Sequence, residues 1–210
     1  ASMLVALLEY PNAVAGDIGS ILVTVLGLII GAIAFSGSMI AFAKLDGRVG
    51  DYMKPFMTYL NLVLLIVTIG IGVYITISPN PPAEMSMALY ALLAIALVYG
   101  VMFVMPIGGA DMPVVISLLN SLTGIAAAMA GFIYSNQAMI LGGILVGAAG
   151  MILTMLMCKA MNRSLLNVII GAFGGGGAAA TGDVQGSIKE IQLSDAAVLL
   201  SYSQKIVVIP

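Results

Sequence analysis

Long apolar runs separated by short polar loops make up most of the 210-residue chain. A helix needs about 20 apolar residues to cross the hydrocarbon core of a bilayer. Five stretches have this length: 18–43, 56–77, 85–106, 112–134 and 138–158. Residues 1–8 are also apolar, and we interpret them as the tail of a sixth span. The pattern predicts an all-α fold, a polytopic bundle of transmembrane helices over residues 1–163.

The pattern changes after Arg163. Residues 164–187 run from a short apolar piece into a segment rich in Gly, Ala, Thr and Ser, which is typical of a linker or hinge. Within residues 188–210, Ser194 is a good N-cap for a short helix, and "KIVVIP" at 205–210 is typical of a buried parallel strand. We therefore expect the beginning of a soluble α/β domain there, truncated by the end of the chain.

Composition supports a membrane protein, because 61% of the residues are hydrophobic and only 8% are charged. The expected surrounding is a lipid bilayer, and no nucleic-acid partner is expected. Histidine is absent, so the side chain best suited to proton exchange near neutral pH is missing. The single cysteine, Cys158, excludes an internal disulfide and a cysteine-based metal cluster. We expect no metal site in this chain.

Charge predicts the orientation of the spans, because short loops rich in Lys and Arg stay on the cytoplasmic side. Five basic residues lie in the loops that follow the first and fifth full spans: Lys44, Arg48, Lys54, Lys159 and Arg163. The loops 9–17, 78–84 and 135–137 contain none. An outside start therefore places both basic loops in the cytoplasm. Asp111 then lies at the inner mouth, and Asn120 lies about 13 Å deeper at 1.5 Å per residue.

Polar side chains at membrane depth are energetically expensive, so each needs a partner or a function. The candidates on the spans are Ser36, Ser38, Asn61, Asn120, Ser121 and Thr123. Asn120 has two interpretations that the residues alone leave open. It can join two helices through its amide, which is worth roughly 0.6–2 kcal/mol, or line a hydrated path beside a titrating group on another helix. For Ser36 and Ser38 the simplest interpretation is a hydroxyl bonded to its own helix.

Other residues belong to the ends and contact faces of the spans. Asp111 precedes Pro113, so we interpret it as a capping carboxylate at a helix start, a role compatible with receiving protons or cations at the channel mouth. Arg163 is either a snorkelling anchor or the point where the membrane and soluble parts meet. Glycines mark close helix contacts: Gly27 and Gly31 form one GxxxG pair, Gly143 and Gly147 another, and Gly37 and Gly150 extend the two faces. We expect the first and fifth spans to be packed inside the bundle.

Several stretches together resemble one family. These are "GAIAFSGSMIAFAKLDG", "IGGADMPVVISLLNSLTGIAAAMAGF", "LVGAAGMILTMLMCKAMNRSLLNVIIGAFG" and the closing "KEIQLSDAAVLLSYSQKIVVIP". In this order they resemble the β subunit of the proton-translocating nicotinamide nucleotide transhydrogenase, over nearly the whole chain. The resemblance implies the last spans of the membrane domain and the linker to an NADP(H)-binding domain, in an oxidoreductase that couples hydride transfer between NAD(H) and NADP(H) to proton movement.

The resemblance also implies roles for single residues. Asn120 matches a mid-membrane Asn that pairs with a channel histidine, and Asp111 matches an acidic residue at the inner side. Ser38 matches a serine of the first full span, and Arg163 a basic hinge residue. Gly37 and Gly150 match glycines at close helix contacts. The channel histidine would belong to the helix that ends in "ASMLVALL", so the group that Asn120 should serve is not in this chain.

Cofactors and partners follow from the same resemblance. NADP(H) and NAD(H) would bind domains or subunits outside this chain, and the fragment alone is not expected to be catalytic. The expected partners are the transhydrogenase α subunit and the rest of the β subunit, in a homodimer of αβ units in the bacterial cytoplasmic (inner) membrane. The alternatives are a passive membrane anchor and a small secondary transporter, although the inverted repeat of such transporters is not found.

Overall fold

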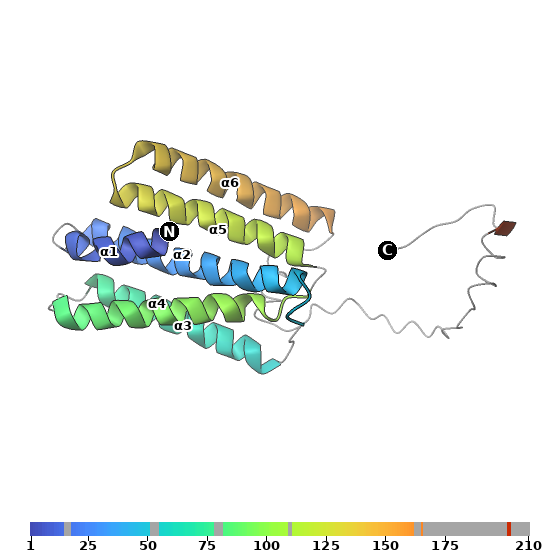
Figure 1. Cartoon of the computed structure of the whole chain (residues 1–210), viewed down its shortest axis with the longest axis horizontal. Coiled ribbons are helices and arrows are strands. Elements are labelled where there is room, and N and C mark those ends of the chain that lie inside the picture. Colours follow the sequence, from blue (N-terminus) through green and yellow to red (C-terminus); the bar gives the residue numbers. More distant parts are fainter. Residues whose placement is uncertain are drawn as a thin grey trace. The chain divides into compact units, whose positions relative to one another are not determined.

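The structure is a computed structural model that describes residues 1–14, 18–50, 55–77, 82–108, 111–161, 165 and 201–202. Its described part contains six helices: α1 (Ser2–Val14), α2 (Ile18–Leu45), α3 (Pro55–Ile77), α4 (Pro82–Val104), α5 (Met112–Ile133) and α6 (Gln137–Ala160) (Figure 1). The five helices α2 to α6 are long and apolar enough to cross a membrane. The prediction of a helical protein with five full spans is therefore confirmed. Helix α1 extends to Val14, past the expected tail at residues 1–8.

The chain divides into two compact units, Ala1–Gly177 and Ala178–Pro210. The first unit contains all six helices. In the second unit the structure describes only Ser201 and Tyr202, which are helical. The expected linker at 164–187, apart from the helical Leu165, lies outside the described residues, as does the expected strand at 205–210.

Helix α2 is the centre of the first unit. It contacts α1, α3, α4 and α5, whereas α6 packs against α5. Figure 1 shows this order, with α5 and α6 side by side on one flank of α2 and α4 with α3 on the other. Glycines on α2 allow the close approach of its neighbours. A Cβ at Gly37 would lie 2.9 Å from Cδ2 of Leu119 on α5, and one at Gly27 would lie 3.2 Å from Cβ of Met129.

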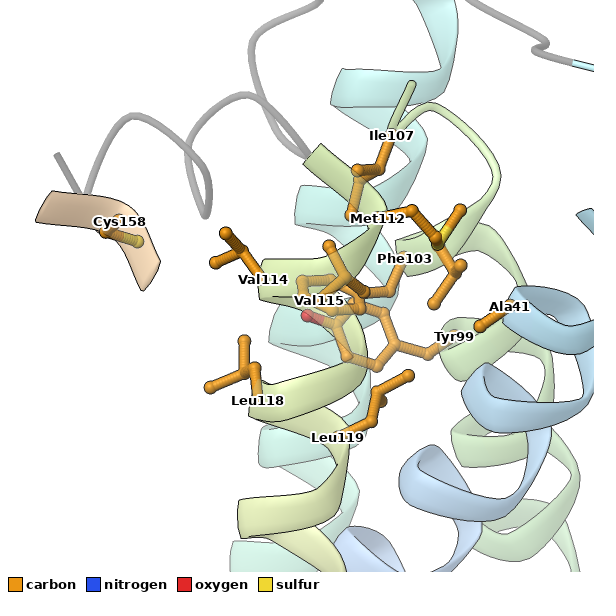
Figure 2. Packing of buried hydrophobic residues seen from close by; sticks show 11 residues of the cluster. Ala41, Tyr99, Phe103, Ile107, Met112, Val114, Val115, Leu118, Leu119 and Cys158 are labelled. Carbon is orange, nitrogen blue, oxygen red and sulfur yellow. The ribbon is translucent and has the colours of Figure 1, made fainter. Parts of the chain in front are cut away.

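Two apolar clusters fill the spaces around α2. In the cluster of Figure 2, Tyr99 and Phe103 of α4 meet Met112 and Val115 of α5 and Ala41 of α2. The second cluster joins α1, α2, α3 and α4 through Ala6, Tyr10, Val25, Leu28, Ile75, Leu89 and Leu92. Because the two clusters lie at different levels along α2, this helix is held against its neighbours over most of its length.

The prediction that the fifth span lies inside the bundle is wrong. Only 22% of the residues in the most apolar window of α6 are buried, compared with 56% in the corresponding window of α5. Gly143, Gly147 and Gly150 do face α5, but the other side of α6 is exposed, with Leu145 at 69% and Leu141 at 62%. A glycine face shows that a helix has one close neighbour, and it does not show that the helix is surrounded.

Candidate functional site

Two polar side chains share an uncovered face formed by α2 and α5. Ser38 on α2 and Asn120 on α5 are both exposed. Their sequence neighbours Gly37 and Leu119 are in direct contact, because a Cβ added at Gly37 would lie only 2.9 Å from Cδ2 of Leu119. Ser38 and Asn120 therefore lie at the same level along the bundle. This level is about 12 Å from the start of α5 at 1.5 Å per residue.

A groove of about 180 Å³ runs beside this pair and is lined by Ser38, Ala41, Phe42, Leu45, Ile116 and Leu119. Asn120 follows Ile116 by four residues, so it lies one turn farther along the same side of α5. Thr123 is also exposed there. We call Ser38, Ile116, Asn120 and Thr123 the open face.

The hydrogen bonds of the open face are few. The Thr123 hydroxyl donates to the Leu119 carbonyl of its own helix at 2.9 Å. Among the described residues, neither Asn120 nor Ser38 has a hydrogen-bond partner for its side chain. Within this part of the chain, Asn120 thus does not join two helices, and the interpretation that Ser38 bonds to its own helix is wrong. Ser36 does so, because its hydroxyl donates to the Ala32 carbonyl at 2.9 Å.

Asp111 lies at the N-cap position of α5, but the prediction that its carboxylate caps this helix is wrong. Its backbone has φ −92° and ψ −4°, and its side chain makes no capping hydrogen bond. A capping side chain needs an extended backbone to reach the free N–H groups, and here the backbone is already helical. The backbone N–H of Asp111 donates to the Gly108 carbonyl at 3.1 Å, so Asp111 belongs to a tight turn before α5.

The same end of the bundle is held by Lys44. Its Nζ donates to the carbonyl oxygens of Met105 at 2.6 Å and Ile107 at 2.8 Å. These carbonyls follow the last residue of α4, where the helix dipole favours a cation. Lys44 therefore joins the end of α2 to the segment that leads into Asp111. The sequence pattern indicates only an orienting role for Lys44, because no spacing predicts this contact.

Buried hydroxyl groups join α5 to α6, and sequence reasoning missed two of the three. The Ser121 hydroxyl donates to the Gly147 carbonyl at 2.6 Å, and the Thr154 hydroxyl lies 3.0 Å from Ser117 Oγ. Ser117 and Thr154 were not among the candidates. A signal was present, because Ser117 precedes Ser121 by four residues and Thr154 follows Gly150 by four, which places each pair on one helix side.

The remaining candidates have separate positions. Asn61 is fully buried and its Nδ2 donates to the Met102 carbonyl at 2.8 Å, so it joins α3 to α4. A Cβ at Gly150 would lie 2.9 Å from Cα of Ser121, which makes Gly150 a point of backbone contact between α5 and α6. Arg163 lies outside the described residues.

Three cavities of the described helices have linings that do not fit a dinucleotide. The groove beside Ser38 and the cavity between α5 and α6 are lined mainly by apolar side chains, and a third cavity at the other end of the bundle contains Glu9 but no Lys or Arg. Nothing in them would neutralise a pyrophosphate. In the described part of the chain, no three His, Cys, Asp or Glu side chains come together as metal ligands.

Comparison with known proteins gives the family. The family model described as NAD(P) transhydrogenase beta subunit matches residues 1–210. The chain belongs to this family. It is 45% identical over 195 residues to the NAD(P) transhydrogenase subunit beta of Rhodospirillum rubrum and equally to the protein of that name from a named strain of the species. These alignments cover 91% of this chain and 41% of each relative, so this transhydrogenase β chain spans less than half of their length.

Membership and fold together make this chain a membrane protein. Five apolar helices of spanning length occur in a member of a transhydrogenase β family. The resemblance stated from the sequence is thereby confirmed. The functional roles of the candidate residues stay predictions: Asn120, Ser38, Asp111, Arg163, Gly37 and Gly150.

Proposed function

We propose that this chain forms the proton-translocating membrane part of a transhydrogenase that couples hydride transfer between NAD(H) and NADP(H) to proton movement. The observation that carries the proposal is the open face. Ser38 and Asn120 expose polar groups at one level within two spanning helices. Contact of such groups with lipid is unfavourable, so we infer that protein or water covers them in the assembled enzyme.

The open face would form one wall of the proton path. An amide such as Asn120 can both donate and accept a hydrogen bond, and the hydroxyl of Ser38 can do the same. Neither group titrates near neutral pH, and the chain contains no histidine. We therefore propose that the titrating group belongs to a segment or subunit outside this chain, and that Asn120 sets the pKa of that group by hydrogen bonding, at about 1.4 kcal/mol per pKa unit.

Asp111 and Arg163 would connect the path to the soluble domains. Asp111 lies in the turn before α5, about 13 Å along the helix axis from Asn120. We propose that it receives protons at the cytoplasmic mouth and that Arg163 acts at the hinge toward the NADP(H)-binding domain. Hydride transfer itself would occur between nucleotides held outside this chain, so the described helices contribute proton conduction and no step of the hydride chemistry.

The proposed setting is the bacterial cytoplasmic membrane, with both basic loops on the cytoplasmic side. The proposed partners are the transhydrogenase α subunit and the rest of the β subunit, in a dimer of αβ units. Family membership supports an α subunit as partner, because the relatives are named subunit beta. A passive anchor is a weaker interpretation, since an anchor needs no polar groups at mid-membrane depth.

Replacement of Asn120 tests the proposal. In the assembled enzyme in sealed vesicles, Asn120→Ala should slow both proton uptake and coupled hydride transfer about tenfold, the change that 1.4 kcal/mol produces. Ser38→Ala should slow both to a smaller extent. Thr76→Val is the matched control, because the Thr76 hydroxyl donates to the Gly72 carbonyl of its own helix, away from the open face. Unchanged rates with Asn120→Ala would refute this role.

A further inference from the structure

The contact between α5 and α6 contains a closed triangle of oxygen atoms. The Thr154 hydroxyl oxygen lies 2.8 Å from the Gly150 carbonyl oxygen and 3.0 Å from Ser117 Oγ. Ser117 Oγ lies 3.3 Å from the same Gly150 carbonyl oxygen. Both side chains are buried, with Thr154 at 0% and Ser117 at 5% exposure. The two hydroxyl protons can fill only two of the three contacts at a time. In either arrangement Ser117 can donate to the Gly150 carbonyl, while Thr154 donates to Ser117 or to the same carbonyl of its own helix.

Several hydroxyls on the spanning helices bond only within their own helix among the described residues. Thr24, Thr68, Thr76 and Thr123 each donate to the carbonyl four residues back in their own helix. Such bonds leave neighbouring helices free to rotate or slide against each other. The bonds of Ser117 and Ser121 cross to α6, so they depend on the relative position of the two helices.

The helix surfaces that these bonds join, on α5 and α6, consist largely of small residues. A Cβ at Gly124 would lie 2.5 Å from the backbone nitrogen of Gly147, and one at Gly150 would lie 2.9 Å from Cα of Ser121. The two backbones are therefore in direct contact at these glycines, although Ile125 of α5 also packs against Gly147. Interlocking side chains normally fix the register of two helices, and here the directional hydroxyl bonds must supply much of that constraint.

The rotation of α5 decides where Asn120 points. Ser117 and Asn120 are three residues apart, so they are neighbours around the helix. Ser117 faces α6, and Asn120 lies on the open face. A rotation that broke the Ser117 bond would also turn Asn120 away from its present direction. The rotation of α5 about its own axis thus determines both whether Ser117 can bond to the Gly150 carbonyl and where Asn120 points.

We propose that Ser117 and Thr154 are positioning residues, which fix the rotation of α5 on α6 and so hold Asn120 toward the proton path. This inference rests on the proposed function of Asn120. It adds a specific device, the hydroxyl triangle with the Gly150 carbonyl, to the wall formed by the open face. In this proposal the two residues act on proton transfer only through Asn120.

The test compares Thr154→Val, which keeps the side-chain shape and removes the hydroxyl, with Thr154→Ser, which keeps the hydroxyl. In the assembled enzyme in sealed vesicles, Thr154→Val and Ser117→Ala should each slow coupled hydride transfer and proton uptake about threefold to tenfold, as expected for one or two interhelical hydrogen bonds in a membrane. Thr154→Ser should retain the rate within twofold. Thr68→Val is the control, since Thr68 is equally buried and bonds only within its own helix among the described residues.

A double variant separates positioning from general stability. If Thr154 acts through Asn120, Thr154→Val should have no further effect on the rate in an Asn120→Ala background. Multiplicative losses would overturn the inference, as would full rates in both Thr154→Val and Ser117→Ala. If one variant does not assemble, the other still gives the answer. Normal rates in the single variant Asn120→Ala would show that the proposed function has failed. Slow rates in Asn120→Ala with normal rates in Thr154→Val and Ser117→Ala would show that only the positioning role has failed.

Discussion

Lys44 stabilises the Asp111 end of the bundle through two charge-assisted hydrogen bonds, to the carbonyls of Met105 and Ile107. Lys44→Met would keep the length of the side chain and leave both carbonyls without this donor. Hydrogen bonds to charged groups contribute about 1.5–3 kcal/mol, so we expect destabilisation of that size. Unfolding of the purified protein by sodium dodecyl sulfate in mixed micelles, followed by circular dichroism, would measure the change.

Lys159 provides the matched control for Lys44. It lies in the last turn of α6 and is exposed. Among the described residues its side chain has no hydrogen bond or ion pair. Lys159→Met removes the same charge near the same end of the bundle. We expect the free energy of unfolding of this variant to stay within about 0.5 kcal/mol of that of the parent protein. Equal losses in both variants would show that net charge, and no specific bond of Lys44, stabilises this end.

At the level of helices, adjacent glycines on α6 have opposite surroundings. A Cβ at Gly143 would lie 2.7 Å from the Gly124 carbonyl oxygen on α5, whereas one at Gly142 would meet nothing within 4 Å. Gly143→Val should therefore separate α5 from α6 and destabilise the protein by about 1–3 kcal/mol. Gly142→Val changes helix propensity equally and should have little effect. The same detergent unfolding experiment compares them, and similar stabilities would contradict the observed contact.

The helices themselves were predictable because their signal is local. A run of about 20 apolar residues can satisfy its backbone in lipid only as a helix, so five spans followed from the sequence alone. Burial was less predictable, because it depends on neighbours. The glycines of α6 indicated a close contact, yet α5 is the more buried helix and α6 is exposed on its outer side.

For the molecule as a whole, the candidate site could be predicted only in part. Asn120 and Ser38 stood out because polar residues are rare in spanning helices, and they do share one face of the structure. Their common level depends on the contact between Gly37 and Leu119, which no sequence spacing reveals. The triangle of Ser117, Thr154 and Gly150 was missed for a different reason. The four-residue spacings were a signal, but hydroxyls in membrane helices usually bond to their own backbone.

The orientation of the whole bundle gives a final prediction. Lys44 in the last turn of α2 and Arg48 just after this helix lie near Gly50, at an end that the positive-inside rule assigns to the cytoplasm. Gln137 begins α6 at the other end of the bundle, after a loop without Lys or Arg. Both positions are exposed, and a Cβ at Gly50 would meet nothing within 4 Å. Each can therefore carry a cysteine probe without disturbing the packing.

With Cys158→Ala as background, a membrane-impermeant maleimide added to intact cells should label Gln137→Cys and leave Gly50→Cys unlabelled. After the cells are permeabilised, both should react, which controls for access to each loop. Cys158 itself is 3% exposed, so its replacement removes a buried thiol and no loop contact. If only Gly50→Cys were labelled in intact cells, the bundle would have the opposite orientation in the membrane. Asp111 would then face the outside, and its proposed role as the cytoplasmic proton receptor would be excluded.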